Sequence, residues 1–141
     1  AAGKGLVVFD SDFAVPLRAT ETTILHSALF KMPSVADGSE AHAAMLEVVA
    51  QFNAVPGVVA SFRRAGHGPL SKEALLEALA WPDKSGGFTH YLCVVCDDDA
   101  ALKGYLHGEP HKAWVPVARP NFEGDPPSLI FDCPLLLSAE L

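Results

Sequence analysis

Two apolar segments, residues 24–31 and 88–96, constrain the fold of this chain most. Side chains alternate between two faces along each segment, which is typical of a partly buried β-strand. Between them, residues 41–52 place apolar side chains three and four positions apart, as an amphipathic helix does: Ala41, Ala44, Met45, Val48, Val49 and Phe52. A chain with both periods must pack helices on a sheet, because neither element can bury its apolar side alone.

The rest of the chain extends this pattern. We predict further strands over residues 58–64 and 128–133, a short helix over 72–81, and helices over 100–106 and from 110 through 117. The order predicts a βαββαβ arrangement, an α+β fold with one sheet and helices on one of its faces.

Polar residues and prolines mark where these helices begin. Ser34 and Asp37 have the spacing of a capping box before the first helix, and Ser71 precedes the short one. Residues 97–99 are three aspartates, which we interpret as a cap and as favourable charge at a helix start. Pro110 suits the first turn of the last helix.

Composition and charge exclude several classes of partner. Of 141 residues, 50% are hydrophobic and 19% charged, so we expect a second copy to cover part of the surface. The net charge of −7 argues against binding to nucleic acid or to anionic membranes. No apolar run approaches the roughly 20 residues of a membrane span.

The cysteines and the start of the chain bear on its compartment. Cys93 and Cys96 lie three apart in a predicted strand, so they point to opposite faces and cannot chelate a metal or pair. We interpret them as buried structural thiols, which favours a reducing compartment, the cytoplasm or a plastid. The chain begins at Ala1 without Met, which indicates trimming or processing, such as removal of a transit peptide. Residues 1–22 are predicted to be an N-terminal extension.

Five short motifs in one order carry a family resemblance. They are His26–Lys31 (HSALFK), Val55–Val58 (VPGV), Gly87–His90 (GFTH), Tyr105 with His111, and Leu129–Asp132 (LIFD). In this order they resemble the dimeric α+β barrel (Dabb), or stress-responsive A/B barrel, family. The resemblance covers a domain at residues 23–137 and implies a ferredoxin-like, antiparallel four-stranded sheet. It also implies a homodimer formed through the sheet faces. We expect Leu25 and Leu29 to face the helices. The sheet face that carries His26 and His90 would then be covered by the second subunit.

Some members, the plant olivetolic acid cyclase-like proteins, are cofactor-independent polyketide cyclases that close a chain by aldol condensation. The resemblance implies catalytic roles for His111 as base, Tyr105 as hydrogen-bond donor to the developing oxyanion, and His26 as an orienting group. An imidazole suits this chemistry because its ordinary pKa lies near neutrality. The small hydrophobic ligand would lie in an apolar pocket predicted from Phe30, Ala44, Val48, Leu92, Val94 and Trp114.

Structural and functional alternatives stay open at this stage. His26 can be a core histidine bonded to a neighbour, and Tyr105 and His111 can simply share a hydrogen bond. His90 is interpreted as structural, and His42, His67 and His107 as surface or loop residues. No cofactor and no metal site is predicted, because Gly108 and Pro110 interrupt the helical spacing of His107 and His111. The alternative functions are a non-catalytic stress-associated protein and a cofactor-free monooxygenase.

Overall fold

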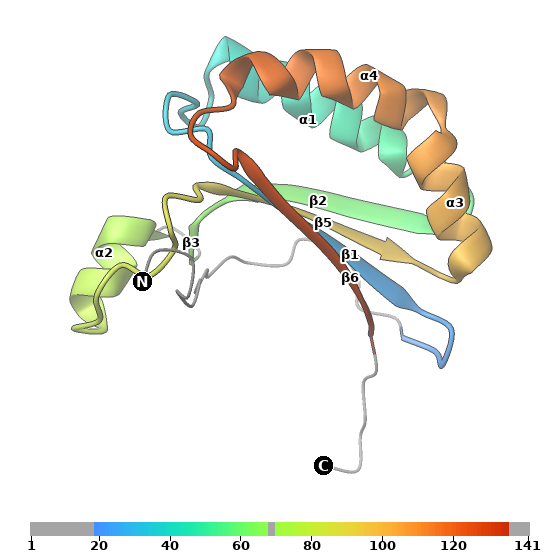
Figure 1. Cartoon of the computed structure of the whole chain (residues 1–141), viewed down its shortest axis with the longest axis horizontal. Coiled ribbons are helices and arrows are strands. Elements are labelled where there is room, and N and C mark those ends of the chain that lie inside the picture. Colours follow the sequence, from blue (N-terminus) through green and yellow to red (C-terminus); the bar gives the residue numbers. More distant parts are fainter. Residues whose placement is uncertain (1–18, 68–69, 136–141) are drawn as a thin grey trace.

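A computed structural model describes residues 19–67 and 70–135 of the 141-residue chain. Its centre is an antiparallel four-stranded sheet in the order β2-β5-β1-β6, with helices on one face (Figure 1). The strands are β1 (Ile24–Phe30), β2 (Val58–Arg64), β5 (His90–Cys96) and β6 (Ser128–Pro134). The predicted ferredoxin-like βαββαβ sheet is therefore confirmed.

The two central strands are the most apolar of the four. β1 pairs with both β5 and β6, so that Ser27 lies opposite Cys93 on one side and Phe131 on the other. β5 is bounded by β1 and β2 and is buried along nearly its whole length. The edge strands carry the exposed residues, including Arg63 and Arg64 at the end of β2. Central strands can be this apolar because both of their backbone edges are already paired.

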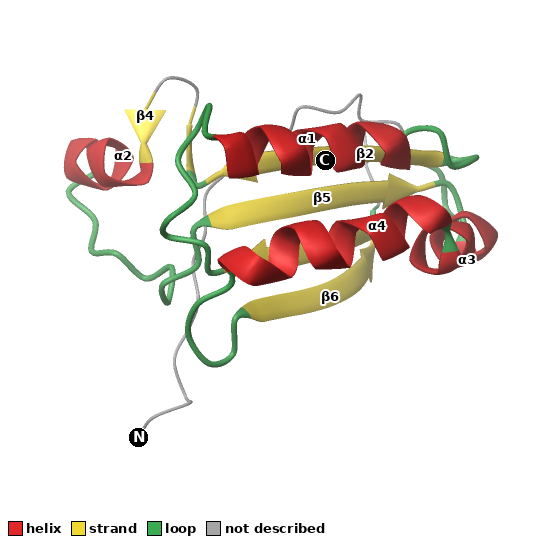
Figure 2. Ribbon diagram, turned by 90° about the horizontal axis from the view of Figure 1, so that it is seen from above, coloured by secondary structure: helices red, strands yellow, loops and turns green. Residues whose placement is uncertain are grey.

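Three helices lie on one face of this sheet. α1 (Glu40–Phe52) runs above β2, and α4 (Glu109–Ala118) runs between β5 and β6 in the view from above (Figure 2). α3 (Asp99–His107) begins at Asp98, whose side chain accepts a hydrogen bond from the Ala101 N–H at 2.8 Å. Gly108 lies between the end of α3 and the start of α4, so the two helices meet at a bend. The predicted aspartate cap is confirmed.

The helices cover the face of the sheet that we did not expect them to cover. Ala28, Phe30, Leu92 and Val94 pack in the main core with α1 and α4, so the face of His26 and His90 is the one that the helices cover. The prediction for Leu25 and Leu29 was wrong. A period of two shows that a strand has two faces, but both faces of β1 are apolar, so the sequence does not identify the inner one.

The segment between β2 and β5 forms a small unit beside the sheet. It contains β3 (Gly66–His67), β4 (Leu70–Ser71) and α2 (Lys72–Ala78), and no residue of α2 is buried. Figure 1 shows α2 outside the layer of α1 and α4. Ser71 caps α2 as predicted, through a 3.2 Å hydrogen bond from the Ala74 N–H. The helix ends at Ala78 rather than residue 81, and Ala80 has a φ of 50°.

The cap of α1 differs from the predicted one. Ser39 caps the helix, and its hydroxyl accepts a hydrogen bond from the His42 N–H at 3.2 Å. Ser34 is exposed and lies in the preceding loop. The capping-box spacing of Ser34 and Asp37 was therefore misleading, because helix formation starts only where the backbone turns after Gly38, at a φ of 77°.

The cysteines behave as predicted from the strand period. Cys93 and Cys96 are free, buried and divided between two apolar clusters on opposite faces of the sheet. Burial raises the pKa of the Cys93 thiol to about 11 and that of Cys96 to about 12. Both thiols are therefore protonated and unreactive at neutral pH.

Two remaining predictions concern the ends of the chain and membranes. Most of the predicted extension at residues 1–22, and the end of the domain at 136–137, lie outside the described residues. Within residues 19–67 and 70–135, none of the helices has the length and apolar character needed to cross a bilayer.

The observed cap predicts a position-specific loss of stability. Replacing Ser39 with Ala leaves an N–H at the start of α1 without its partner, and we expect the free energy of unfolding to fall by about 1 kcal/mol. Urea unfolding followed by circular dichroism measures this change. The matched Ser34→Ala variant should unfold like the wild type. Equal losses in both variants would contradict the assignment of the cap.

Candidate functional site

A cavity of about 200 Å³ lies between α4 and the half of the sheet formed by β1 and β6. Arg119 and Ile130 on its border are exposed, so it reaches the surface beside the edge strand. Its lining is mostly apolar and contains two histidines, one tyrosine, one serine and one arginine. The lining residues are His26, Ala28, Phe30, Leu92, Tyr105, His111, Trp114, Val115, Arg119, Phe122, Ser128 and Ile130.

Most of the residues predicted for the site meet in this cavity. The three side chains predicted to be catalytic, His26, Tyr105 and His111, all line it. Of the six predicted pocket residues, it is lined by Phe30, Leu92 and Trp114.

The other three predicted pocket residues do not line the cavity. Val48 and Val94 are buried in the main core, and Ala44 is half-buried on α1. Their place in the layers gives the reason, because α1 runs above β2 and the cavity lies under α4. Ala44, Val48 and Val94 therefore lie outside this cavity.

A buried histidine and a carboxylate form the strongest polar contact in the cavity wall. The Nδ1 of His26 lies 2.6 Å from Oδ1 of Asp132. The register of β1 with β6 sets these residues directly opposite one another. Because a carboxylate oxygen accepts hydrogen bonds, Nδ1 of His26 carries the proton of this contact. His26 is therefore bonded to a neighbouring side chain, which was one of the alternatives left open by the sequence.

Asp132 is a site residue that the sequence analysis did not identify as one. It was noted only as the end of the LIFD motif, because its distance from His26 in sequence gives no signal of contact. A cross-strand pairing of two predicted strands at this register would have found it, but the register is a tertiary property.

Tyr105 lies between the two histidines. Its ring makes edge-on contacts with His26, at a centroid distance of 5.4 Å, and with His111, at 5.1 Å. The pair shares ring packing and no hydrogen bond, which excludes the simple Tyr–His bond considered from the sequence. Burial raises the pKa of Tyr105 above its ordinary value, so the hydroxyl keeps its proton. Within the described part of the chain that hydroxyl has no hydrogen-bond partner, so it can donate to a ligand.

His111 is the third residue of α4 and is half-buried at the bend after α3. Burial lowers the pKa of His111 below its ordinary value, and the nearby charges of His26 and His107 lower it further. The start of a helix also disfavours an added positive charge. The imidazole is therefore neutral at physiological pH and has a lone pair with which to accept a proton.

Aromatic side chains make the rest of the cavity largely apolar. Phe30 stacks on Phe122 at a centroid distance of 5.3 Å and contacts Trp114 at 5.7 Å. In such surroundings a hydrogen bond from Tyr105 to a developing charge is stronger than in water. Across residues 19–67 and 70–135, no three His, Cys, Asp or Glu side chains are placed to hold a metal ion.

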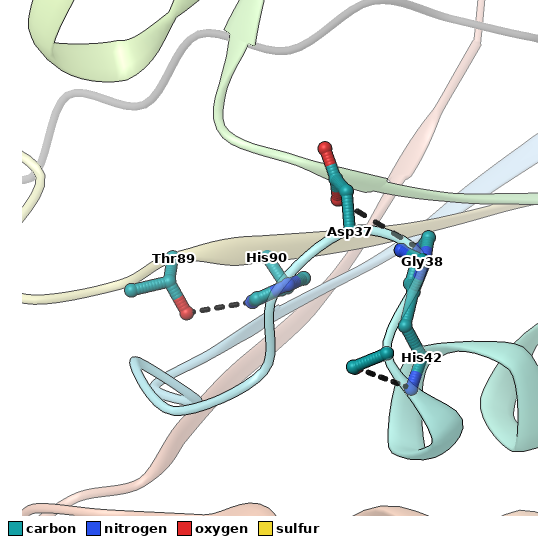
Figure 3. Close-up of polar contacts among 6 residues, drawn as sticks. Asp37, Gly38, His42, Thr89 and His90 are labelled. Carbon is teal, nitrogen blue, oxygen red and sulfur yellow. Dashed lines mark hydrogen bonds and ion pairs between the residues drawn. The ribbon is translucent and has the colours of Figure 1, made fainter.

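His42 and His90 do not line this cavity, and Figure 3 shows the polar contacts around them. His90 is completely buried, its Nδ1 lies 2.7 Å from the Thr89 hydroxyl, and its ring stacks on Phe62. Among the described residues, its Nε2 is the one fully buried side-chain polar atom without a partner. Burial and, to a lesser extent, the charge of Arg64 lower the pKa of His90 to about 4.

The environment of His42 was also predicted incorrectly. We predicted a surface or loop residue, but the ring is half-buried, and its Nδ1 accepts a hydrogen bond from the Gly38 N–H at 3.0 Å (Figure 3). The residue lies one position after the first apolar residue of the helical stripe. The loop before α1 folds back over it, which a helical pattern cannot show.

Comparison with known proteins shows the fold of this chain. No family model and no curated protein sequence matches it. Among solved structures, a Dabb family protein with a ferredoxin-like fold from Mesorhizobium loti is 19% identical, with a TM-score of 0.54 over 81% of this chain and 97% of that one. The chain therefore has the fold of a Dabb protein, as the sequence motifs suggested.

Two further structures have the same fold. A dimeric ferredoxin-like protein from Thermobifida fusca is 14% identical, with a TM-score of 0.57 over 85% of this chain and 97% of that one. The hydroxynitrile lyase from Passiflora edulis is also 14% identical, with a TM-score of 0.54 over 84% of this chain and 98% of that one. At these identities the likeness concerns the fold alone.

The burial of His90 predicts a pH dependence of stability. Its pKa is lower in the folded chain than the 6.5 of an ordinary histidine, so below pH 6.5 the unfolded chain binds a proton that the folded chain does not. The His90 contribution to stability is thus complete above pH 6.5 and is lost as the pH falls toward 4. The slope contributed is at most about 1.4 kcal/mol per pH unit.

Urea unfolding between pH 4 and 7 measures this slope. His90→Leu should flatten it, whereas His107→Leu, at the exposed end of α3, should keep the wild-type slope. An unchanged slope in the His90 variant would show that other groups cause the pH dependence.

Proposed function

We propose that this chain is a cofactor-independent enzyme that moves a proton at a carbon next to a carbonyl group of a small apolar substrate. One observation carries the proposal. His26, Tyr105 and His111, supplied by β1, α3 and α4, converge on one largely apolar cavity.

The proton transfer uses the neutral imidazole of His111. The ring accepts a proton from the carbon next to the carbonyl, and the electrons of that C–H bond form the C=C bond of an enolate. The negative charge develops on the carbonyl oxygen, to which the Tyr105 hydroxyl donates a hydrogen bond. The imidazolium then returns its proton to the product, so the enzyme is regenerated without a cofactor.

His26 orients the substrate in this proposal. Asp132 fixes the ring by accepting the Nδ1–H hydrogen bond, which leaves Nε2 to form a hydrogen bond with a substrate hydroxyl or enol. The packing of Tyr105 against both rings holds the three groups in a fixed arrangement.

The size of the cavity limits the substrate. At about 200 Å³ it is smaller than the roughly 300–1,000 Å³ of pockets for drug-sized ligands. Aldol-type cyclisation, as in a polyketide cyclase, is therefore proposed only for a short dicarbonyl chain, in which the enolate carbon attacks the second carbonyl. The hydroxynitrile lyase from Passiflora edulis supports an enzymatic use of this fold.

We propose that the protein functions as a homodimer joined through the sheet face opposite the helices. Leu25, Val59, Tyr91 and Val95 belong to an apolar cluster on that face, and none of the described helices covers it. On the same face, Leu129 and Phe131 of β6 are 39% and 48% exposed. A face of this kind is typical of a protein interface. The Thermobifida fusca protein of this fold is described as dimeric.

Loss of the base should remove the activity. We expect His111→Gln to slow deuterium exchange at the carbon next to the carbonyl by about 10²–10⁴-fold, because general base catalysis contributes that much. Tyr105→Phe should slow it by a factor of about 10²–10³, the usual effect of losing one oxyanion donor. NMR in D₂O with acetophenone and short 1,3-diketones as probes measures the exchange.

The matched control is His107→Gln, since His107 is exposed at the end of α3 and does not line the cavity. It should exchange at the wild-type rate. Wild-type rates in His111→Gln, or no exchange above the buffer rate with any probe, would support the non-catalytic alternative. Oxygen uptake with quinol probes would instead identify the monooxygenase.

The dimer has its own test. Phe131→Asp places a charge on the open sheet face, and we expect it to shift sedimentation from dimer to monomer without loss of secondary structure. Leu79→Asp, which adds the same charge at an exposed position after α2, should leave the dimer intact. A wild-type chain that sediments as a folded monomer would overturn the assembly.

A further inference from the structure

We propose that Arg119 binds a carboxylate of the substrate, so that the natural substrate is a small carbonyl acid rather than a neutral ketone. The proposal rests on the function proposed above, and it names the substrate class for the same cavity. In such a substrate, the reacting carbonyl and the carboxylate stand at opposite ends of an apolar body.

Arg119 supplies the one permanent charge in the described wall of the cavity. The other lining side chains are apolar, neutral hydroxyls or imidazoles. Arg119 is also exposed, at the end of α4 and the start of the 3₁₀ turn η1 (Arg119–Asn121). It therefore stands where the apolar cavity meets solvent, a place where a ligand's charged end can stay partly hydrated.

Arg119 has no ion-pair partner in the described part of the chain, although the chain has 17 acidic residues and only 10 lysines and arginines. Two lysines elsewhere in the chain are paired, Lys112 with Glu109 at 2.8 Å and Lys72 with Asp83 at 3.0 Å. The carboxylate of Asp132 is bonded to His26. The Arg119 guanidinium is thus available to a ligand.

The position of Arg119 on α4 sets the length of the substrate. His111 and Arg119 are eight residues apart on or at the end of α4, which separates their backbones by about 12 Å at 1.5 Å per residue. The pairing of β1 with β6 runs in the same direction along the cavity. Ser128 lies opposite Phe30 near one end, and Asp132 lies opposite His26 toward the other. The backbones of the reactive residues and of Arg119 therefore lie toward opposite ends of the cavity.

Aromatic side chains form the wall between these two ends. Phe30 contacts both Phe122 and Trp114, and all three line the cavity. They fit a flat apolar body such as a benzene ring or a short alkyl chain. The guanidinium can bind the two oxygens of a carboxylate with two parallel hydrogen bonds, which gives orientation as well as affinity. A ligand held in this way points its carbonyl end at Tyr105 and His111.

A matched pair of ligands tests the proposal. 4-Acetylbenzoate carries a carboxylate opposite its acetyl carbonyl, and 4-acetylbenzamide has the same shape without the charge. Trp114 lines the cavity, so its fluorescence reports binding once the other tryptophan, the exposed Trp81, is replaced by Phe. In this Trp81→Phe protein we expect 4-acetylbenzoate to bind at least about tenfold more tightly than the amide.

Arg119→Gln should remove that preference by weakening the binding of the acid to that of the amide, while the binding of the amide itself stays unchanged. Arg64→Gln is the matched control, because it removes the same charge from an exposed position outside the cavity, and it should keep the preference. Equal affinities for acid and amide in the parent protein, no binding of the acid, or equal loss in both arginine variants would each overturn the proposal.

Measurements on the same variants distinguish the failure of this proposal from the failure of the proposed function. His111→Gln in the Trp81→Phe protein should keep the preference for the acid, because binding does not need the base. If that variant exchanges deuterium at the parent rate, the proposed function fails while the Arg119 result stands. If it loses exchange but acid and amide bind equally, the function stands and the carboxylate site fails.

Discussion

The pairing of β6 with β1 is the contact on which the candidate site depends. β6 is the last described strand and is added to the sheet along its full length beside the first. That pairing sets Asp132 against His26, and it also provides one wall of the cavity through Ser128 and Ile130. A shift of one residue in the register would turn Asp132 to the other face of the sheet and separate it from His26. The backbone hydrogen bonds of an edge strand thus determine the polar chemistry of the interior.

A second constraint is the bend between α3 and α4. Gly108 ends one helix and Pro110 starts the next, so Tyr105 and His111 come from two helix axes and meet edge-on. On one continuous helix, positions six apart would point in quite different directions. Phe52 of α1 completes this arrangement by packing against both Tyr105 and Trp114. The aromatic core therefore positions the reactive groups and gives them largely apolar surroundings.

Burial has different consequences for the histidines of this chain. Desolvation lowers the pKa of both His90 and His111, which keeps both rings neutral near pH 7. His90 is completely buried and leaves Nε2 unpaired, so its burial costs stability on acidification. His111 borders a cavity, where the same lone pair becomes available to a ligand. The difference lies in the space beside each ring and not in the residue type.

The sequence by itself determined the number, order and type of the main elements, because local periods and capping residues encode elements directly. Its family motifs also pointed to six of the side chains that line the cavity. It also placed Cys93 and Cys96 on opposite faces, since that follows from the geometry of any strand. Only the tertiary structure decided which face of β1 is inside, that Ser39 and not Ser34 caps α1, and that Asp132 and Arg119 border the site. Those facts arise from register, loop paths and the packing of distant segments, and no local pattern of residues carries them.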